Sequence, residues 1–170
     1  MQFIKTDLAK QLEETYLGLD FILVRGTEGS SGYDIKACIE APVTIFPDQV
    51  VKIPTGIKLW NGSDELINRV QQLRTLGFPG DFKLAGFLLP RSSTKGAILN
   101  NTIGLCDEDY QGEIFVKLRN ITNEAITINT GEAFAQLVFM LTYIPKELEE
   151  VSTFSINTIR GDGGFGSTGR

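Results

Sequence analysis

Residues 104–114, GLCDEDYQGEI, decide how the rest of the sequence is interpreted. Apolar residues lead into three carboxylates, Asp107, Glu108 and Asp109, and a second apolar run begins at Ile114. A strand, an acidic turn and another strand are typical of a β-hairpin. Carboxylates this close together repel one another and raise one another's pKa. We therefore expect either water or a cation to offset the electrostatic repulsion between them.

Composition excludes several kinds of chemistry. The chain has 170 residues, no histidine and two cysteines, Cys38 and Cys106. Catalytic arrangements that need histidine are excluded, most zinc chemistry is too, and two cysteines cannot form a disulfide framework. A metal, if used, should be a hard ion held through oxygen, with Mg²⁺ as the first choice.

Length and charge indicate one domain, spanning residues 1–170, with an ordinary core. No export signal and no apolar run long enough for a membrane helix is present, which predicts a cytoplasmic protein, in the host cytoplasm if the source is viral. The net charge of −5 argues against stable nucleic-acid binding. It does not argue against a small anion held by a few arginines.

Short runs with alternating apolar and polar residues predict an all-β fold. Glycine and proline turns separate them, which is typical of a barrel or a sandwich. Besides the strands that flank the acidic turn, the predicted strand regions are 21–26, 33–46, 49–60, 82–90, 114–120, 125–131 and 134–144.

Four segments depart from this rhythm. Residues 1–20 form an N-terminal extension, in which 2–14 are either amphipathic or a strand followed by one helical turn. A helix is predicted at 63–77, inside an insertion at 61–80, because Ser63 is a good N-cap and Gly77 a good end. Residues 145–151 could form one or two helical turns. The glycine-rich tail, 158–170, should be a mobile arm when unoccupied.

Two segments carry groups suited to phosphate. Arg91, Ser92 and Ser93 offer a guanidinium, two hydroxyls and backbone amides, although an ordinary surface loop would explain this tripeptide alone. The arm leaves backbone N–H groups unobstructed, and its aromatic ring, Phe165, has no core to join and should stack on a base. The alternative is a solubilising tail. Together with the acidic turn, these segments predict a nucleotide phosphate site.

Five segments, in order, resemble the motifs of the trimeric dUTPases. They are SSGYDIKA (30–37), PRSS (90–93), NNTIGLCDEDYQGEI (100–114), GEAFAQLVF (131–139) and RGDGGFGSTG (160–169). The resemblance implies a jelly-roll-like β-barrel subunit and a homotrimer with composite active sites. It also implies hydrolysis of dUTP to dUMP and pyrophosphate, which supplies dUMP and limits uracil incorporation into DNA.

The resemblance implies a role for each matching residue. Asp107 would deprotonate the water that attacks the α-phosphorus, Tyr110 would press on the deoxyribose, and Asp34 would hold waters of a Mg²⁺ ion on the triphosphate. The base would be read by Asn101 and by the backbone of Leu105, Cys106 and Phe115. Phosphate oxygens would be held by Arg91, Ser92, Ser93 and Gln136. The residues that close over the nucleotide would be Arg160, Phe165, Gly166, Ser167 and Thr168.

The sequence also departs from this family pattern. Ala133 stands where the fourth motif usually has an arginine, the link between Arg91 and Asp107 is slightly short, and the helix at 63–77 is extra. Two alternatives stay open. A dCTP deaminase shares the implied fold, and a dUTPase-like regulator could use the inserted helix to bind a protein partner.

Overall fold

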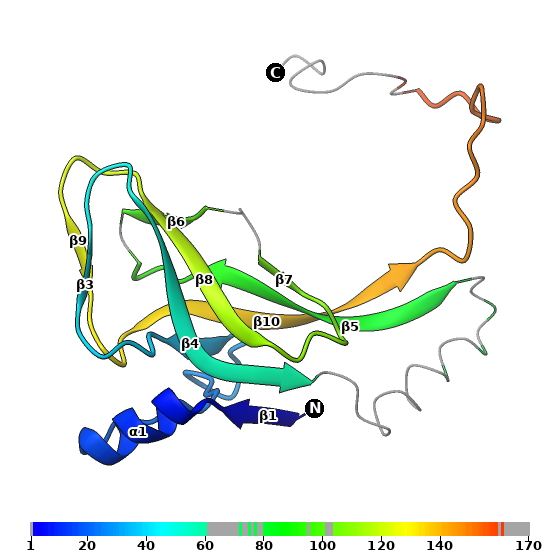
Figure 1. Cartoon of the computed structure of the whole chain (residues 1–170). Helices are drawn as coiled ribbons and strands as arrows, with labels where there is room; N and C mark the ends of the chain where they lie inside the picture. The colour runs from blue at the N-terminus through cyan, green and yellow to red at the C-terminus, as the bar shows by residue number, and fades with distance from the viewer. Residues whose placement is uncertain are drawn as a thin grey trace.

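Ten strands and one helix form the part of the chain that this computed structural model describes, namely residues 2–60, 72, 75, 77, 80–94, 96–100, 104–159 and 161. They are arranged as two four-stranded sheets and a two-stranded sheet, and every pairing within the sheets is antiparallel. Figure 1 shows the two larger sheets facing each other, with the smaller one at one end. The all-β, jelly-roll-like prediction is confirmed.

The first sheet has the strand order β1-β4-β8-β6. Its strands are β1 (Gln2–Lys5), β4 (Val50–Trp60), β8 (Glu113–Asn120) and β6 (Ala97–Leu99). Along β8, alternate residues from Ile114 to Asn120 are buried, as expected for a strand with one face in the core. The predicted strands at 49–60 and 114–120 are confirmed.

The second sheet has the order β2-β10-β5-β7, and it contains most of the predicted site residues. Its strands are β2 (Tyr33–Lys36), β10 (Ala133–Ile144), β5 (Asp81–Pro90) and β7 (Gly104–Cys106). The small sheet pairs β3 (Val43–Ile45) with β9 (Ile126–Ile128).

A single apolar cluster joins the two larger sheets. Ile53 and Leu118 from the first sheet and Ile35 and Leu137 from the second are at most 1% exposed and belong to this cluster. Burial of each such side chain contributes about 1.5–3 kcal/mol, so the cluster holds the sheets face to face.

The N-terminal residues form a strand and a helix, which matches the second of the two predicted alternatives, although the helix is longer than one turn. Helix α1 (Asp7–Thr15) begins after Thr6, whose hydroxyl accepts a hydrogen bond from the Ala9 N–H at 3.3 Å. Ala9 packs closely against Gly56, since a Cβ added at residue 56 would lie 2.8 Å from the Ala9 Cβ. Gly56 has a φ of 71°, and the β4–β8 register shifts around it, so a glycine is required here.

The hairpin prediction is wrong. Strand β7 pairs with β5, whereas β8 pairs with β4 and β6, so the strands on either side of the acidic turn belong to different sheets. Alternation along the sequence assigns a strand and its buried face. It does not select the partner, which depends on contacts between residues far apart in the chain.

Two other predictions need correction. Residues 21–26 contain a single isolated bridge, Val24 to Asp34, because Phe21 packs in a small cluster beside α1. Residues 145–151 are not helical and are exposed throughout, since this short segment has no apolar surface to pack against. In Figure 1 the chain after β10 runs away from both sheets.

The inserted helix predicted at 63–77 lies almost wholly outside the described residues, and its partner-binding role stays a prediction. The boundaries of the extension, the insertion and the arm also stay predictions, as does the cytoplasmic location. None of the helices in the described residues is long and apolar enough to cross a membrane.

Candidate active site

The divergence of β7 and β8 opens a cleft of about 270 Å³ beside the acidic turn. We call it the β7–β8 cleft. Leu105 and Tyr110, at its edge, are 57% and 47% exposed, although both carry large apolar surfaces. Exposed apolar groups around a concave site are typical of a ligand pocket. The cleft is lined by Lys52, Leu88, Gly104, Leu105, Cys106, Asp107, Tyr110, Glu113, Ile114 and Phe115.

The turn holds Tyr110 in a defined position. The Tyr110 N–H donates to the Asp107 carbonyl at 3.2 Å, and the Tyr110 hydroxyl donates to the Glu113 carbonyl at 2.9 Å. The ring passes so close to Gly112 that a Cβ there would collide with it. The glycine is therefore required for the position of the tyrosine.

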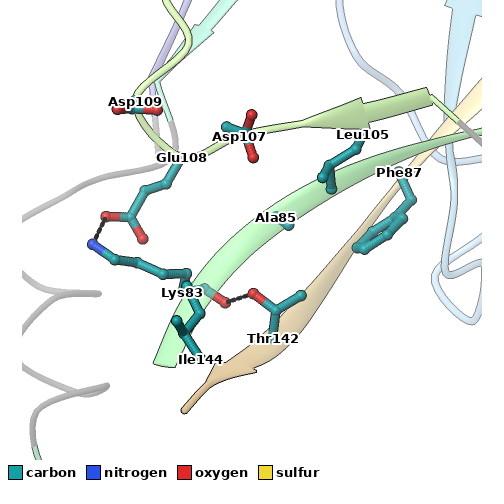
Figure 2. Close-up of a pocket in the computed structure, with 9 residues that line it drawn as sticks. All are labelled: Lys83, Ala85, Phe87, Leu105, Asp107, Glu108, Asp109, Thr142 and Ile144. Atoms are coloured by element: carbon teal, nitrogen blue, oxygen red, sulfur yellow. Dashed lines mark hydrogen bonds and ion pairs between the residues drawn. The ribbon is translucent and has the colours of Figure 1, made fainter. Parts of the chain in front are cut away.

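Asp107 lies between the β7–β8 cleft and a second pocket of about 420 Å³, which we call the β5–β10 pocket. Its side chain is exposed, and its carboxylate has no hydrogen-bond or ion-pair partner among the described residues. Figure 2 shows this carboxylate above β5, next to Glu108, whose own carboxylate is paired with Lys83. An uncommitted carboxylate at the edge of a cleft can accept a proton from a bound water.

Cys106 is a packing residue and not a nucleophile. It is 8% exposed and belongs to the main apolar cluster. Burial, with a smaller contribution from the charge of Asp107, raises the pKa of its thiol to about 11. The thiol is therefore protonated at neutral pH, when a thiolate would be needed for attack. The role of its backbone toward a base stays a prediction.

Three predicted phosphate or metal residues meet on adjacent strands of the second sheet. Gln136 of β10 is paired with Asp34 of β2 on one side and with Leu89 of β5 on the other. Arg91, directly after β5, forms an ion pair with Asp34 at 3.0 Å and donates to the Ala133 carbonyl at 2.7 Å. We call Asp34, Arg91 and Gln136 the Arg91 cluster.

The sequence supports this cluster locally. Gly32 lies against the Gln136 side chain, where a Cβ would collide with the amide. The Gln136 amide donates to the Pro90 carbonyl at 2.9 Å. Ser93 lines a pocket of about 360 Å³ together with Arg91 and Ala133, so the small residue at 133 leaves open space there. Ser92 lies in the turn after β5.

No group of three or more cysteine or carboxylate side chains suited to a metal is found within the described ranges. Asp34 contributes a single carboxylate, and it is already paired with Arg91. This arrangement does not fit an all-protein metal cage. It fits an ion that brings most of its own ligands, as Mg²⁺ on a nucleotide does.

Within the described residues, Asp107 and the Arg91 cluster line different pockets. Asp107 follows Cys106, which is paired with Gly86 of β5, whereas Arg91 lies five residues after Gly86, just past the end of β5. At about 3.3 Å per residue, the two are separated by roughly 15–20 Å of strand.

Six predicted site residues lie outside the described residues: Asn101, Arg160, Phe165, Gly166, Ser167 and Thr168. Two lysines that the sequence did not single out line the pockets beside Asp107. The Lys52 ammonium lies 3.7 Å from the centre of the Phe115 ring, and Lys83 is paired with Glu108. No sequence signal separates them from other lysines at alternate positions of a strand.

Comparison with known proteins identifies the family. A family model described as dUTPase matches residues 66–169. The deoxyuridine 5'-triphosphate nucleotidohydrolase of Legionella pneumophila is 38% identical over 147 residues, covering 85% of this chain and 84% of that one. Among solved structures, the dUTPase of Staphylococcus bacteriophage 80alpha with dUPNHPP has a TM-score of 0.72 at 20% identity and covers 99% of this chain and 98% of that one.

A variant of the dUTPase from phage phi11 of S. aureus, described with a structural Mg(II) ion, has a TM-score of 0.64 at 18% identity and covers 91% of this chain and 98% of that one. At such low identity, the two phage enzymes support the fold. The family model and the bacterial relative go further, because they match most of the sequence. The chain belongs to the dUTPase family.

Proposed function

We propose that this protein is a dUTP diphosphatase, which hydrolyses dUTP to dUMP and pyrophosphate. The observation that carries the proposal is the β7–β8 cleft, in which an uncommitted carboxylate, Asp107, lies beside a fixed aromatic ring, Tyr110. Membership of the dUTPase family identifies the substrate class that suits this cleft.

The cleft is proposed to bind the deoxyuridine part of the substrate. Tyr110 would cover the deoxyribose and leave no space for a 2′-hydroxyl, since its hydroxyl is anchored to the Glu113 carbonyl. The backbone groups of Leu105, Cys106 and Phe115, with Asn101, would pair with the base. A site that rejects close analogues through steric clash or an unpaired polar group discriminates strongly.

Asp107 is proposed to act as the general base. It would take a proton from a water molecule while the water oxygen attacks the α-phosphorus. The bond from that phosphorus to the oxygen bridging to the β-phosphate then breaks, and pyrophosphate leaves with the electron pair. Phosphoryl transfer needs positioning and charge neutralisation more than covalent help, so a protein without histidine can perform it.

The Arg91 cluster, with Ser92 and Ser93, is proposed to hold the phosphate chain. Arg91 and Asp34 are paired in the free protein, and the pair would part when the guanidinium turns to phosphate oxygens. The Asp34 carboxylate would then be available for waters of a Mg²⁺ ion that arrives with the triphosphate. When bound, this ion would neutralise phosphate charge.

A homotrimer with composite active sites is proposed because the described residues of one chain place the two halves of the site apart. Asp107 and Arg91 line different pockets. Residues 145–159, which follow β10, are exposed throughout and display apolar side chains, with Leu148 and Phe154 90% and 87% exposed. Apolar side chains in such number are normally covered by a partner surface. Residues 160–168 would then close over a neighbouring site.

The proposal is tested with purified protein, Mg²⁺ and either dUTP or dCTP. We expect proton and pyrophosphate release from dUTP, together with a trimer by light scattering. Ammonia release from dCTP would instead identify a deaminase. Intact dUTP after long incubation with an assembled trimer would overturn the proposed function.

A further inference from the structure

We propose that Lys83 is a positioning residue for this reaction. Through Glu108 it holds the acidic turn, and thereby Asp107, against the second sheet. This inference rests on the proposed function, because Asp107 is the group whose position matters. It assigns a role to a residue outside the resemblance segments.

The contacts join the turn to β5 at two adjacent residues. One Glu108 oxygen accepts a hydrogen bond from the Lys83 ammonium at 3.2 Å, and the other accepts one from the Leu84 N–H at 3.4 Å. The Glu108 side chain is only 23% exposed, so this pair is shielded more than a typical surface pair. Figure 2 shows Lys83 reaching toward Glu108 across the β5–β10 pocket.

Lys83 is itself held by the sheet behind it. It is paired with Thr142 in the β5–β10 ladder, and the Thr142 hydroxyl donates to the Lys83 carbonyl at 3.1 Å. Figure 2 shows this bond together with the pair between Lys83 and Glu108. The chain of contacts therefore runs from β10, through Lys83, to Glu108 and the turn.

Asp107 depends on this chain because it has no anchor of its own. Its carboxylate has no partner in the described part of the chain, so its position is set by the backbone of the turn. Beyond strand β7, which is paired with β5 up to Cys106, two side chains among the described residues attach that backbone: Tyr110 toward β8 and Glu108 toward β5. With one attachment lost, the turn could pivot about the other. A misplacement of about 1 Å at a catalytic group can cost up to ~100-fold in rate.

The test compares kcat and KM for dUTP in Lys83→Met, Glu108→Gln and the double variant. We expect each single change to lower kcat by about three- to tenfold while KM stays within about twofold, since the cleft and the Arg91 cluster are untouched. The kcat of the double variant should be no lower than that of the less active single variant, because both changes break the same contact. Lys83→Arg keeps the charge and should recover at least about half of kcat.

Arg119→Met is the matched control. Its ion pair with Asp48 is 3.0 Å long, against 3.2 Å for Lys83 and Glu108, and likewise joins a strand to a turn. The Arg119 side chain is 46% exposed against 44% for Lys83. We expect its kcat to match that of the parent. Thermal unfolding and light scattering establish that each variant is folded and assembled, and if Lys83→Met fails to fold, Glu108→Gln and Lys83→Arg carry the test.

The outcomes separate the two proposals. Unchanged kcat in Lys83→Met and Glu108→Gln, with an active parent enzyme, overturns the positioning role alone. An equal fall in Arg119→Met, or strictly additive losses in the double variant, also overturns it. An assembled parent enzyme that leaves dUTP intact overturns the proposed function itself.

Discussion

The β7–β8 cleft and the Arg91 cluster are built in opposite ways. The cluster arises within one sheet, where antiparallel pairing places Asp34, Gln136 and the end of β5 side by side. The cleft arises between sheets, where β7 and β8 separate and leave the acidic turn to cross the gap. In the cluster the charged groups are already paired with each other, whereas Asp107 in the cleft has no partner among the described residues.

From this difference we expect the Arg91 cluster to serve substrate binding and Asp107 in the β7–β8 cleft to serve the chemical step. The Arg91 cluster is proposed to hold the phosphate chain and takes no part in the proton transfer, so changes there should appear mainly in KM. An unpaired carboxylate on a turn acts only if the turn is well placed, so changes there should appear mainly in kcat. The predictions below would confirm or break that division.

The largest effect is expected for Asp107→Asn. It removes the proposed base and leaves the phosphate contacts intact, so kcat should fall by about 10²–10⁴-fold while dUTP still binds. Pyrophosphate release measures the rate, and calorimetry with a non-hydrolysable analogue measures binding. Asp109→Asn is the matched control on the same turn and should change kcat by no more than a few-fold. Unchanged turnover in Asp107→Asn would disprove the assignment of the base.

On the cluster side, Arg91→Met should raise KM for dUTP by about 10- to 100-fold with a smaller effect on kcat, because a charge-assisted contact to phosphate is lost. Steady-state kinetics over a wide dUTP range would measure both constants. A large loss of kcat with KM unchanged would show that the cluster serves the chemical step, and the division would fail.

Gly112→Ala should displace the Tyr110 ring, since a methyl group at this position collides with it. We expect the preference for dUTP over UTP, as a ratio of kcat/KM values, to fall by about tenfold. Gly29→Ala is the control, because a Cβ there meets nothing within 4 Å. A preserved preference in Gly112→Ala would show that Tyr110 does not reject the 2′-hydroxyl.

The smallest effect is expected for Lys5→Met, which is remote from both regions. Lys5 bonds Glu13 at 2.8 Å and Asp20 at 2.9 Å, and tethers α1 to the first sheet. Burial alone would lower the pKa of Lys5, but these two carboxylates raise it, and the hydrogen bond from Lys5 lowers the pKa of Asp20 below its usual 3.8. The free energy of unfolding should fall by about 1 kcal/mol at pH 7.

The pH dependence of that loss has a defined sign. The contribution of Asp20 is present above its usual pKa and is lost as the pH falls through the lowered value, whereas that of Lys5 is present below its usual pKa and is lost as the pH rises through the raised one. The Tm difference between parent and Lys5→Met should therefore be largest between about pH 4 and pH 10 and shrink on either side. A change of kcat or KM at neutral pH in Lys5→Met would mean that the β7–β8 cleft or the Arg91 cluster depends on contacts remote from it.

The sequence by itself determined most of the strands. The predicted regions 49–60, 114–120 and 134–144 correspond to β4, β8 and β10, and along β8 the buried face also follows from the alternation, because period-two burial is a local property. It also pointed to Asp107, Arg91 and Asp34 through their resemblance segments. It did not determine that β1 is followed by a full helix held by Gly56, a residue distant in the chain.

Only the tertiary structure decided the pairings. That β7 joins β5 and not β8, that Arg91 meets Asp34, and that Lys83 meets Glu108 are all outcomes of contacts between residues 16 or more positions apart. Local sequence sets backbone preference and the buried face, whereas the choice of partner depends on which long-range arrangement buries the most apolar surface. The acidic turn was therefore visible in the sequence, but the cleft beside it was not.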